Sequence, residues 1–337
     1  MSELPELVQA LLDPQSYPGP PKRVELIQTQ ISYVFIAGDL VYKVKKPVDM
    51  GFLDYSTLEK RLTLCIKELE LNRRLCPDAY LEVVPVTGDD GKIVMDGRGD
   101  IKEYAVKMRR LPREAMMDYL LQQNNVTPDM LAMVAKKLAV FHRSTATDEI
   151  ISDFGTLEAV TRITLEDNFG QTAKYVGTVI PPEKYNYLKE RTGNFLKKNA
   201  PLFQKRVSDG RIRDCHGDLH AAHVCFTGNI CIYDCIEFND SLRYTDVAAE
   251  VAFLAMDLDH YGRSDLSNSF IDAYVKESGD EELRSLLDFY KCYRAYVRAK
   301  VGCFQYDDKY IDAGEKEKIL ENTRSYVKLA ESYAENK

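Results

Sequence analysis

Apolar and polar positions alternate with a period of two in several short runs near the start of the chain, which is the pattern of strands with one buried face. Gly38 and Asp39 separate two of these runs, so we expect the chain to turn back on itself there. The strands predicted by this alternation are residues 24–29, 33–36, 40–45, 81–86 and 104–108.

Helical spacing of apolar residues marks much of the remaining chain. The clearest early example is residues 58–75, which follow the capping candidates Ser56 and Thr57 and end before Pro77. A short helix is expected over residues 4–12, before a Pro-rich segment. Further helices are predicted over residues 130–144, 247–261, 267–275, 281–305 and 315–335, so the second half of the chain is mainly helical.

Two aspartates stand in the stretch that is most typical of a chemical site. Asp218 lies in Cys-His-Gly-Asp-Leu-His at residues 215–220, and Asp234 follows an apolar run. Residues 224–226 and 230–233 are typical of two strands around a Gly-Asn turn, so this hairpin would carry Asp234 back beside Asp218. Phosphate transfer to an alcohol needs one carboxylate for the hydroxyl proton and another to hold magnesium. The hairpin therefore favours a phosphoryl-transfer site over an ordinary turn.

A zinc site is the rival interpretation of the same stretch. His216, His220 and His223 are three of the five histidines and fall within eight residues. Three imidazoles can hold zinc with an open position for water, as in a zinc-dependent hydrolase. Gly217 makes a continuous helix less favourable, and strand-like residues begin directly after His223. The three rings are therefore not expected to share one face.

The segment His-Gly-Asp-Leu-His resembles the catalytic loop of the aminoglycoside phosphotransferase and choline kinase branch of the protein-kinase-like fold. A bacterial group of aminoglycoside-phosphotransferase-like proteins is similar over residues 41–48, 52–57, 214–220 and 234–239. Some members carry an appended P-loop ATPase domain, whose Gly-x-x-x-x-Gly-Lys-Ser/Thr motif this sequence lacks.

This resemblance implies an α+β fold with two lobes, like that of protein kinases. An N-terminal helix and Pro-rich segment would occupy residues 1–21. An antiparallel-sheet N-lobe that binds nucleotide would follow over residues 22–110. A mainly helical C-lobe with the catalytic loop and the acceptor pocket would occupy residues 111–337. The group's acceptor is not settled, so the likeness implies a class of reaction and not a substrate.

The resemblance also implies roles for single residues. Asp218 would orient or deprotonate the acceptor hydroxyl, with His216 and His220 as candidate catalytic neighbours in the same motif. Asp234 would hold the metal ion. In the helix before the catalytic segment His142 is expected to be structural, and Asp246 is expected to brace the catalytic loop from below.

Nucleotide-binding residues follow from the same likeness. Lys43 lies mid-strand in Val-Tyr-Lys-Val and would contact the phosphates, while Lys45 lies on the same face as a competitor. Glu68 would hold the lysine, because Leu71 and Leu75 follow it at the family's spacing; Glu70 is expected on the solvated face. The backbone near Met108 would meet adenine. No Gly-x-Gly-x-x-Gly occurs between the first strands, so Thr29 and Ser32 are the candidates to replace that loop.

His223 is a departure from the family, whose second metal ligand is an asparagine at this position. Magnesium prefers oxygen ligands, whereas imidazole suits softer ions. Three outcomes stay open: metal binding through Asp234 and water, a changed preference toward manganese, or a pseudokinase that binds nucleotide without turnover. Glu237 or Asn239 could restore an oxygen ligand.

Composition sets outer limits on the function. The 337 residues carry a net charge of −8 with a pI near 5.4, which argues against a general nucleic-acid-binding protein. No apolar run of 18 residues occurs, and the N-terminus lacks a signal-like pattern, so a cytoplasmic protein without a membrane segment is expected. The eight cysteines form no Cys-x-x-Cys pair and are predicted to be buried reduced thiols.

The sequence thus predicts an ATP- and magnesium-dependent kinase. It would transfer the γ-phosphate to a hydroxyl of an aminoglycoside-, choline- or sugar-like small molecule. The leading alternative is a catalytically reduced, nucleotide-binding regulator.

Overall fold

The computed structural model describes residues 4–89, 91–308 and 311–335. The chain divides into two compact units. The first comprises the chain up to Tyr119 together with Ala222–Asp240, and the second comprises Leu120–Ala221 with the chain from Ser241 onward. The segment that contains Asp234 therefore packs with the N-terminal residues, although the chain reaches it about a hundred residues later.

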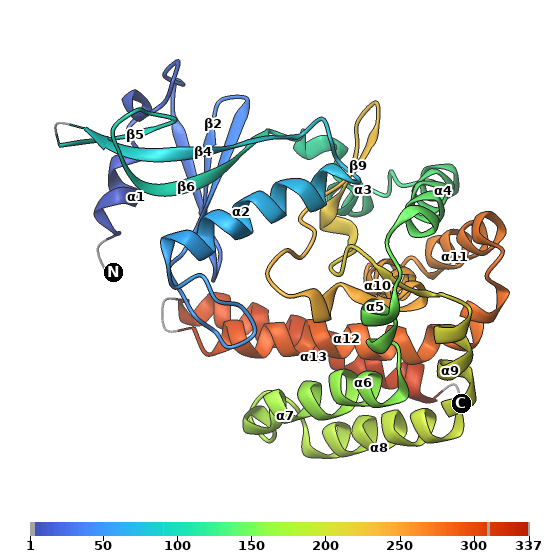
Figure 1. Ribbon diagram of the computed structural model, residues 1–337. Helices are drawn as coiled ribbons and strands as arrows, with labels where there is room; N and C mark the ends of the chain where they lie inside the picture. The colour runs from blue at the N-terminus through green and yellow to red at the C-terminus, as the bar shows by residue number, and fades with distance from the viewer. Residues whose placement is uncertain (1–3, 90, 309–310, 336–337) are drawn as a thin grey trace. The chain divides into compact units, whose positions relative to one another are not determined.

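The first unit is built on a six-stranded sheet in the order β1-β2-β3-β6-β4-β5, in which every neighbouring pair is antiparallel (Figure 1). Its strands are β1 (Val24–Gln28), β2 (Ser32–Ala37), β3 (Leu40–Lys45), β4 (Tyr80–Asp89), β5 (Lys92–Met95) and β6 (Asp100–Arg109). The predicted strands are all present, and β5 is the strand that the alternation pattern missed.

Alternating residues of β3 place apolar side chains on one face of the sheet and lysines on the other. Tyr42 and Val44 lie in an apolar cluster with residues of the N-terminal helix, among them Val8. Because successive side chains of a strand point to opposite faces, Lys43 and Lys45 lie on the other face. The N-terminal elements that cover the cluster are α1 (Glu6–Ala10) and η1 (Pro14–Ser16).

Helix α2 (Leu58–Arg73) packs on β4 and β6 and supplies the acidic group of this unit. Thr57 caps it as predicted, because its hydroxyl accepts from the backbone N–H of Lys60 at 3.3 Å. Such a cap contributes about 1 kcal/mol. Glu68 is fully buried, whereas Glu70 is exposed, as expected for a residue of the solvated face.

The predicted hairpin is present as β8 (Val224–Phe226) and β9 (Ile230–Ile232), which pair in antiparallel register. It packs beside the end of α2, and one prediction was wrong there. Cys76 and Cys231 form a disulfide, with their Cα atoms 4.5 Å apart. The 155 residues between them left no local signal of this proximity. The other six cysteines are buried and form no disulfide, as predicted.

The second unit is mainly helical, with one short pair of strands, β7 (Ile212–Asp214) and β10 (Tyr244–Asp246). Its longer helices are α4 (Pro128–Ser144), α8 (Pro182–Lys198), α9 (Ala200–Ser208), α10 (Val247–His260), α11 (Ser264–Ser278), α12 (Leu287–Tyr306) and α13 (Ala313–Glu335). Its shorter elements are α5 (Glu149–Asp153), α6 (Leu157–Thr161), the π-helical turn η3 (Arg162–Asp167), α7 (Asn168–Thr172), η4 (Ala173–Tyr175) and η7 (Glu281–Ser285).

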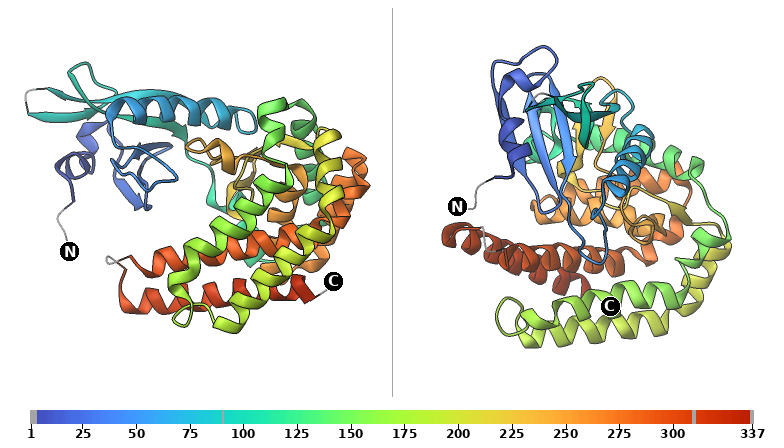
Figure 2. Two further views of the ribbon diagram at one scale, coloured as in Figure 1. Left: turned by 60° about the horizontal axis from the view of Figure 1, so that its bottom comes forward. Right: turned by 60° about the vertical axis from the view of Figure 1, so that its left-hand side comes forward.

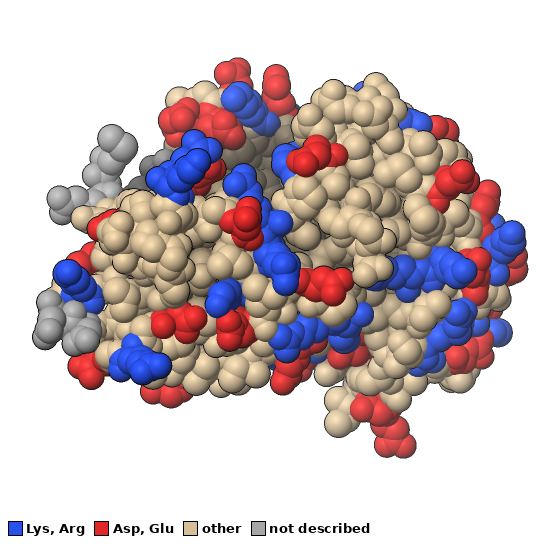
Figure 3. All heavy atoms as spheres, turned by 90° about the horizontal axis from the view of Figure 1, so that it is seen from above, with Lys and Arg blue, Asp and Glu red and all other residues tan. Residues whose placement is uncertain are grey.

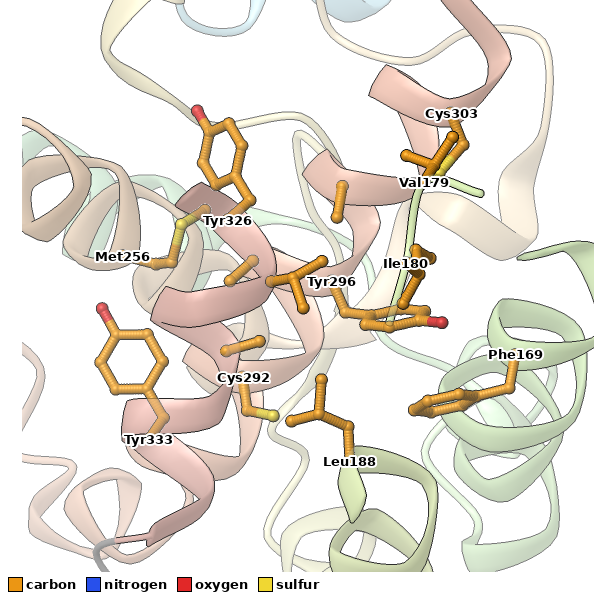
Figure 4. Close-up of a cluster of buried hydrophobic side chains, with 14 of the residues drawn as sticks. Phe169, Val179, Ile180, Leu188, Met256, Cys292, Tyr296, Cys303, Tyr326 and Tyr333 are labelled. Carbon is orange, nitrogen blue, oxygen red and sulfur yellow. The ribbon is translucent and has the colours of Figure 1, made fainter. Parts of the chain in front are cut away.

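Helices α12 and α13 pack along one another (Figure 2). Aromatic side chains fill the adjoining core, where Phe169 stacks on Tyr296 with ring centroids 4.4 Å apart (Figure 4). The predicted helix 281–305 is interrupted at Leu286, which separates η7 from α12. The short helix η2 (Arg113–Ala115) belongs to the first unit. The chain passes from one unit to the other within α3 (Met117–Gln122), η5 (Ala221–His223) and η6 (Asp240–Leu242).

Surface charge is mixed on the face drawn in Figure 3, where lysine and arginine side chains alternate with aspartate and glutamate. Within residues 4–89, 91–308 and 311–335, no helix is both long and apolar enough to cross a membrane.

Candidate active site

Strand β3 and helix α2 build a charged cluster in the first unit. The Lys43 ammonium lies 2.9 Å from Glu68 Oε1 and 2.7 Å from Asp234 Oδ1. Burial alone would lower the pKa of Lys43, but the carboxylates of Asp234 and Glu68 hold that pKa well above its usual value. The predicted lysine, glutamate and aspartate are therefore brought together, with Lys43 charged.

Lys45 makes a second ion pair with the same glutamate. Its ammonium lies 2.6 Å from Glu68 Oε2 and also donates to Glu237, whose carboxylate accepts from the Tyr55 hydroxyl. The Lys45 side chain is 1% exposed, compared with 14% for Lys43. Glu68 thus holds both lysines, and Lys43 is the one that retains exposed surface.

Asp234 has an unusual backbone conformation, with φ of +63°. This left-handed conformation costs a non-glycine residue roughly 1–2 kcal/mol, and such residues cluster at functional sites. Neighbouring groups hold it: the Asp234 N–H donates to the Tyr80 hydroxyl at 3.2 Å, and the next N–H, of Cys235, donates to Asn72 Oδ1 at 2.9 Å. The Asp234 side chain remains 40% exposed, so it can reach a ligand.

His223 lies beside Asp234, with its Nε2 3.6 Å from Asp234 Oδ2. A partly exposed carboxylate next to an imidazole is a donor set that fits a divalent cation, and the imidazole would suit manganese better than magnesium. Glu237 is 3% exposed and bound to Lys45 and Tyr55, so it has no open face for a metal ion. The Asn239 amide donates to the Phe52 carbonyl oxygen at 3.0 Å.

The other nucleotide-binding candidates lie on the sheet. The Thr29 hydroxyl accepts from the N–H of Ser32 at 2.9 Å and so closes the turn between β1 and β2. Ser32 itself is fully buried. Met108 lies near the end of β6 between Val41 of β3 and Tyr80 of β4, and its side chain packs against an apolar cluster.

In the second unit, the loop that carries Asp218 is held by its own backbone. Gly217 has φ of +88°, a conformation that favours glycine. The N–H groups of His216 and Gly217 both donate to Glu250 Oε1 at 2.7 Å. On the other side, Arg294 Nη1 donates to the Gly217 carbonyl at 3.2 Å. Asp218 is thus presented by a backbone that is fixed from two directions.

Glu250 and His142 form the buried support of this loop. His142 Nε2 lies 2.7 Å from Glu250 Oε2, and its Nδ1 lies 2.7 Å from the Tyr274 hydroxyl. Burial would raise the pKa of Glu250, but the hydrogen bond and charge of His142 lower it to about 2. His142 is therefore a structural hydrogen-bonding residue, as predicted.

Asp246 is structural too, although its contacts differ from the expectation. It caps α10 through the Ala248 N–H and binds the guanidinium of Arg206 at 2.7 and 2.9 Å. The bracing contact predicted for it is made by Glu250. A single acidic residue inside the otherwise apolar run of α10 was the signal that could have identified Glu250 from the sequence.

Asp218 and its two histidine neighbours lie together. The Asp218 side chain is 34% exposed, and His220 Nε2 lies 3.6 Å from Asp218 Oδ2. The Asp218 N–H donates to His216 Nδ1 at 3.3 Å, and both histidine side chains are almost fully buried. In the described part of the chain, His216 belongs to no cluster of three or more potential metal ligands, which argues against the three-histidine zinc site.

Comparison with known proteins identifies the relatives of this chain. Uncharacterised proteins from Mycobacterium tuberculosis and Mycobacterium bovis are each 34% identical to it over 284 residues, or 84% of this chain and 55% of theirs. The chain thus spans about half the length of these curated relatives.

Several solved structures share its fold at low sequence identity. An amicoumacin kinase in complex with AMP-PNP, Ca²⁺ and Ami matches at 14% identity and a TM-score of 0.55, covering 96% of this chain and 92% of that one. A Plasmodium vivax ethanolamine kinase matches at 12% identity and a TM-score of 0.52, and the match covers 91% of this chain and 81% of that one. An ADP-bound aminoglycoside phosphotransferase matches at 15% identity and a TM-score of 0.50, and the match covers 97% of this chain and 99% of that one.

These likenesses confirm the predicted α+β, protein-kinase-like fold. The sequence pattern of one family, described as the phosphotransferase enzyme family, matches residues 67–290, a range that contains Glu68, Asp218 and Asp234. This match covers well over half of the chain, and the chain therefore belongs to the phosphotransferase enzyme family.

Proposed function

We propose that this protein transfers the γ-phosphate of ATP to a hydroxyl group of a small molecule. The observation that carries the proposal is the contact of Lys43 with both Glu68 and Asp234, at 2.9 and 2.7 Å. A lysine for the phosphates, a glutamate to hold it and an aspartate for the metal ion are the recurring parts of a kinase nucleotide site.

Asp218 is the proposed base or orienting group. The hydroxyl oxygen of the acceptor would form a bond to the γ-phosphorus, while the bond from that phosphorus to the β,γ-bridging oxygen breaks and ADP leaves. The hydroxyl proton would pass to the Asp218 carboxylate. The paired N–H contacts to Glu250 would keep Asp218 in place, because they fix the two residues that precede it.

Lys43 would bind the nucleotide phosphates once they displace its contact with Asp234, while Glu68 keeps hold of the ammonium. Asp234, with His223 beside it, would hold a divalent cation, which neutralises charge on the phosphates when it is bound. The complexes of the amicoumacin kinase with AMP-PNP and Ca²⁺, and of the aminoglycoside phosphotransferase with ADP, support a nucleotide of this type.

Replacement of Asp218 and Asp234 tests the assignment. Asp218→Asn is expected to lower turnover by on the order of 10²-fold or more and to leave ATP affinity nearly unchanged. Asp234→Ala is expected to abolish metal-dependent nucleotide binding, measured by titration calorimetry. Asp272→Asn, which removes an exposed carboxylate (67% exposed) of the second unit, is the matched control. Normal turnover in Asp218→Asn would remove Asp218 from its assigned role.

A nucleotide-binding regulator without turnover is the second candidate, and His223 at the family's asparagine position favours it. ATP and metal would then raise the melting temperature, as they would for a kinase. No fraction of a metabolite extract would cause ADP release above the level of Asp218→Asn. Release of ADP that depends on an extract fraction would exclude this candidate.

A further inference from the structure

Helix α12 carries cations that have no carboxylate partner. Arg294, Arg298 and Lys300 form no ion pair with any residue of the described chain. Of the three, Arg294 is buried, whereas Arg298 and Lys300 are half-buried. The other buried lysines and arginines that the structure describes are each paired with a carboxylate: Lys45 with Glu68, Arg61 with Glu103, Arg206 with Asp246, Arg243 with Asp214 and Lys291 with Asp259. Arg294 is therefore the exception among the buried lysines and arginines that the structure describes.

Arg294 places one of these charges next to the catalytic loop. Its side chain is 5% exposed and donates to the carbonyl oxygens of Gly217 and Ala249 at 3.2 and 3.1 Å. Its guanidinium also lies 4.6 Å from the centroid of the Phe253 ring. The carbonyl oxygens are neutral, so they orient the Arg294 guanidinium without cancelling its charge. A full positive charge therefore lies next to Gly217, the residue that precedes Asp218.

Arg298 lies one helical turn further along the same face of α12. Its Nε is buried and has no hydrogen-bond acceptor among the residues described, and its guanidinium lies over the Tyr326 ring at 5.7 Å. The Tyr326 hydroxyl in turn lies 3.5 Å from Asp257, which accepts from the N–H of Ala221 at 2.8 Å. This chain of contacts ties Arg298 to the end of the loop that begins at His216.

Neighbouring charged groups also shift the pKa values of Arg298 and Lys300. Burial would lower the pKa of Arg298, but Tyr326 and the carboxylates of Asp218 and Asp257 raise it, although neither carboxylate is close enough for an ion pair. Burial is the main cause that lowers the pKa of Lys300 to about 8; Asp167 partly offsets the burial, and Arg294 adds to the lowering. The charge of Asp167 is therefore too weak at Lys300 to offset the burial of its amine.

We infer that the acceptor is an anionic hydroxyl compound, whose carboxylate or phosphate group binds Arg298 and Arg294 while its hydroxyl faces Asp218. Two guanidinium groups one turn apart suit such an oxyanion, because each can donate paired hydrogen bonds. Buried charges without partners are unfavourable, and a bound anion would supply the missing partner. This inference rests on the proposed function and narrows its acceptor class, since an aminoglycoside- or choline-like acceptor would bring a positive charge to the same residues.

Charge fractionation of a metabolite extract tests the acceptor class. The extract is separated at neutral pH on anion- and cation-exchange resins, and each fraction is assayed for ADP release against Asp218→Asn as the blank. Activity in the fraction retained on the anion exchanger is expected. Activity confined to the unretained or cation-retained fractions would overturn the inference and leave the proposed kinase activity intact. Absence of activity in every fraction would overturn the proposed function, and the inference with it.

Variants of Arg298 test the contact itself with the active fraction. Arg298→Gln is expected to lower kcat/KM for the acceptor about 10- to 100-fold, the usual size of a lost hydrogen bond to a charged group, and to change the KM for ATP less than about twofold. Arg298→Lys keeps the charge and should recover part of the loss. Arg284→Gln, at an exposed arginine paired with Asp272, is the control. A raised KM for ATP with an unchanged acceptor KM would show that Arg298 serves the nucleotide and would overturn the inference.

A binding measurement that does not depend on turnover uses inorganic sulfate as the probe. Sulfate is expected to raise the melting temperature of the wild-type protein more than that of Arg298→Gln, with sodium chloride at equal ionic strength as the reference. Equal shifts in the two proteins would contradict an anion site at Arg298.

Discussion

Buried positive charge has different partners at strand β3 of the first unit and at Arg294 of the second. In the first unit, Lys45 is surrounded by Glu68 and Glu237, and Lys43 by Glu68 and Asp234, so that each ammonium has two carboxylate partners. In the second unit, Arg294 is equally buried but contacts only carbonyl oxygens and aromatic rings. The charges of Lys43 and Lys45 are neutralised without a ligand, whereas the charge of Arg294 has no carboxylate partner.

This difference separates the parts of the site that are preorganised from those that select a substrate. Nucleotide phosphates are common to all kinases, so a lysine already held by a glutamate loses little freedom on binding them. An acceptor differs from one kinase to another, and its recognition depends on charges that only the right molecule neutralises. Stability and activity should therefore respond differently to loss of a cation in each unit.

The largest effect is expected for Lys45→Met. Removing one partner of a buried ion pair leaves the other charged and unpaired, which costs about 3–5 kcal/mol. Glu68 would keep Lys43, but Glu237 would retain only the Tyr55 hydroxyl. Urea unfolding of the wild type and the variant measures the loss. Lys60→Met, at an exposed pair with Asp54, should cost no more than about 1 kcal/mol. Equal losses for both variants would contradict the structural role of Lys45.

For ATP affinity, the variant of Lys43 should have the larger effect and the variant of Lys45 the smaller one, the reverse of their order for stability. Lys43 keeps exposed surface and contacts Asp234, so Lys43→Ala is expected to weaken ATP binding about tenfold or more, measured by titration calorimetry. Lys45→Met, assayed under conditions where it is folded, should weaken it much less. Glu68→Gln should resemble Lys43→Ala, whereas Glu70→Gln on the exposed face of α2 should have no effect. The reverse ranking would move the phosphate anchor to Lys45.

Much of the first unit was predictable because its signals are local. Alternation identified β1, β2 and β3, Thr57 and Pro77 marked α2, and a Gly-Asn turn marked the β8–β9 hairpin. The spacing of Leu71 and Leu75 after Glu68 selected the glutamate that contacts both lysines of β3. Each of these signals lies within about ten residues of the feature that it predicts.

The partners of these residues were not predictable, because they come from distant parts of the chain. Lys45 and Glu237 are 192 residues apart, and no periodicity links them. The sequence suggested that one lysine would bind Glu68, whereas the two carboxylate oxygens serve one lysine each. Glu250 was missed because a charged residue in an apolar helix can be recognised only once its partners, His142 and the loop at Gly217, are known.

A smaller effect is expected from Lys300, a half-buried amine of α12. Its pKa is lowered to about 8 in the folded protein, below the value near 10.5 of an ordinary lysine. Between these two pH values the unfolded chain binds a proton that the folded protein does not, so stability should rise with pH. The gain between pH 8 and pH 9 is about 1 kcal/mol. Urea unfolding at both pH values should show this gain in the wild type relative to Lys300→Met. Parallel pH dependence in the two proteins would contradict the lowered pKa.

The smallest effect concerns His223, the neighbour of Asp234 in the first unit. If its imidazole is a ligand in an active kinase, turnover with manganese should exceed turnover with magnesium about threefold, because a nitrogen ligand suits the softer ion. His223→Asn supplies an oxygen ligand and should return the preference to magnesium. If the site has instead lost its catalytic activity, neither metal will support turnover, and His223→Asn is expected to restore only a trace of it. The ratio of kcat/KM with the two ions measures the preference. A wild type that works best with magnesium, and an unchanged ratio in His223→Asn, would leave His223 as a neighbour of Asp234 at 3.6 Å and not a ligand.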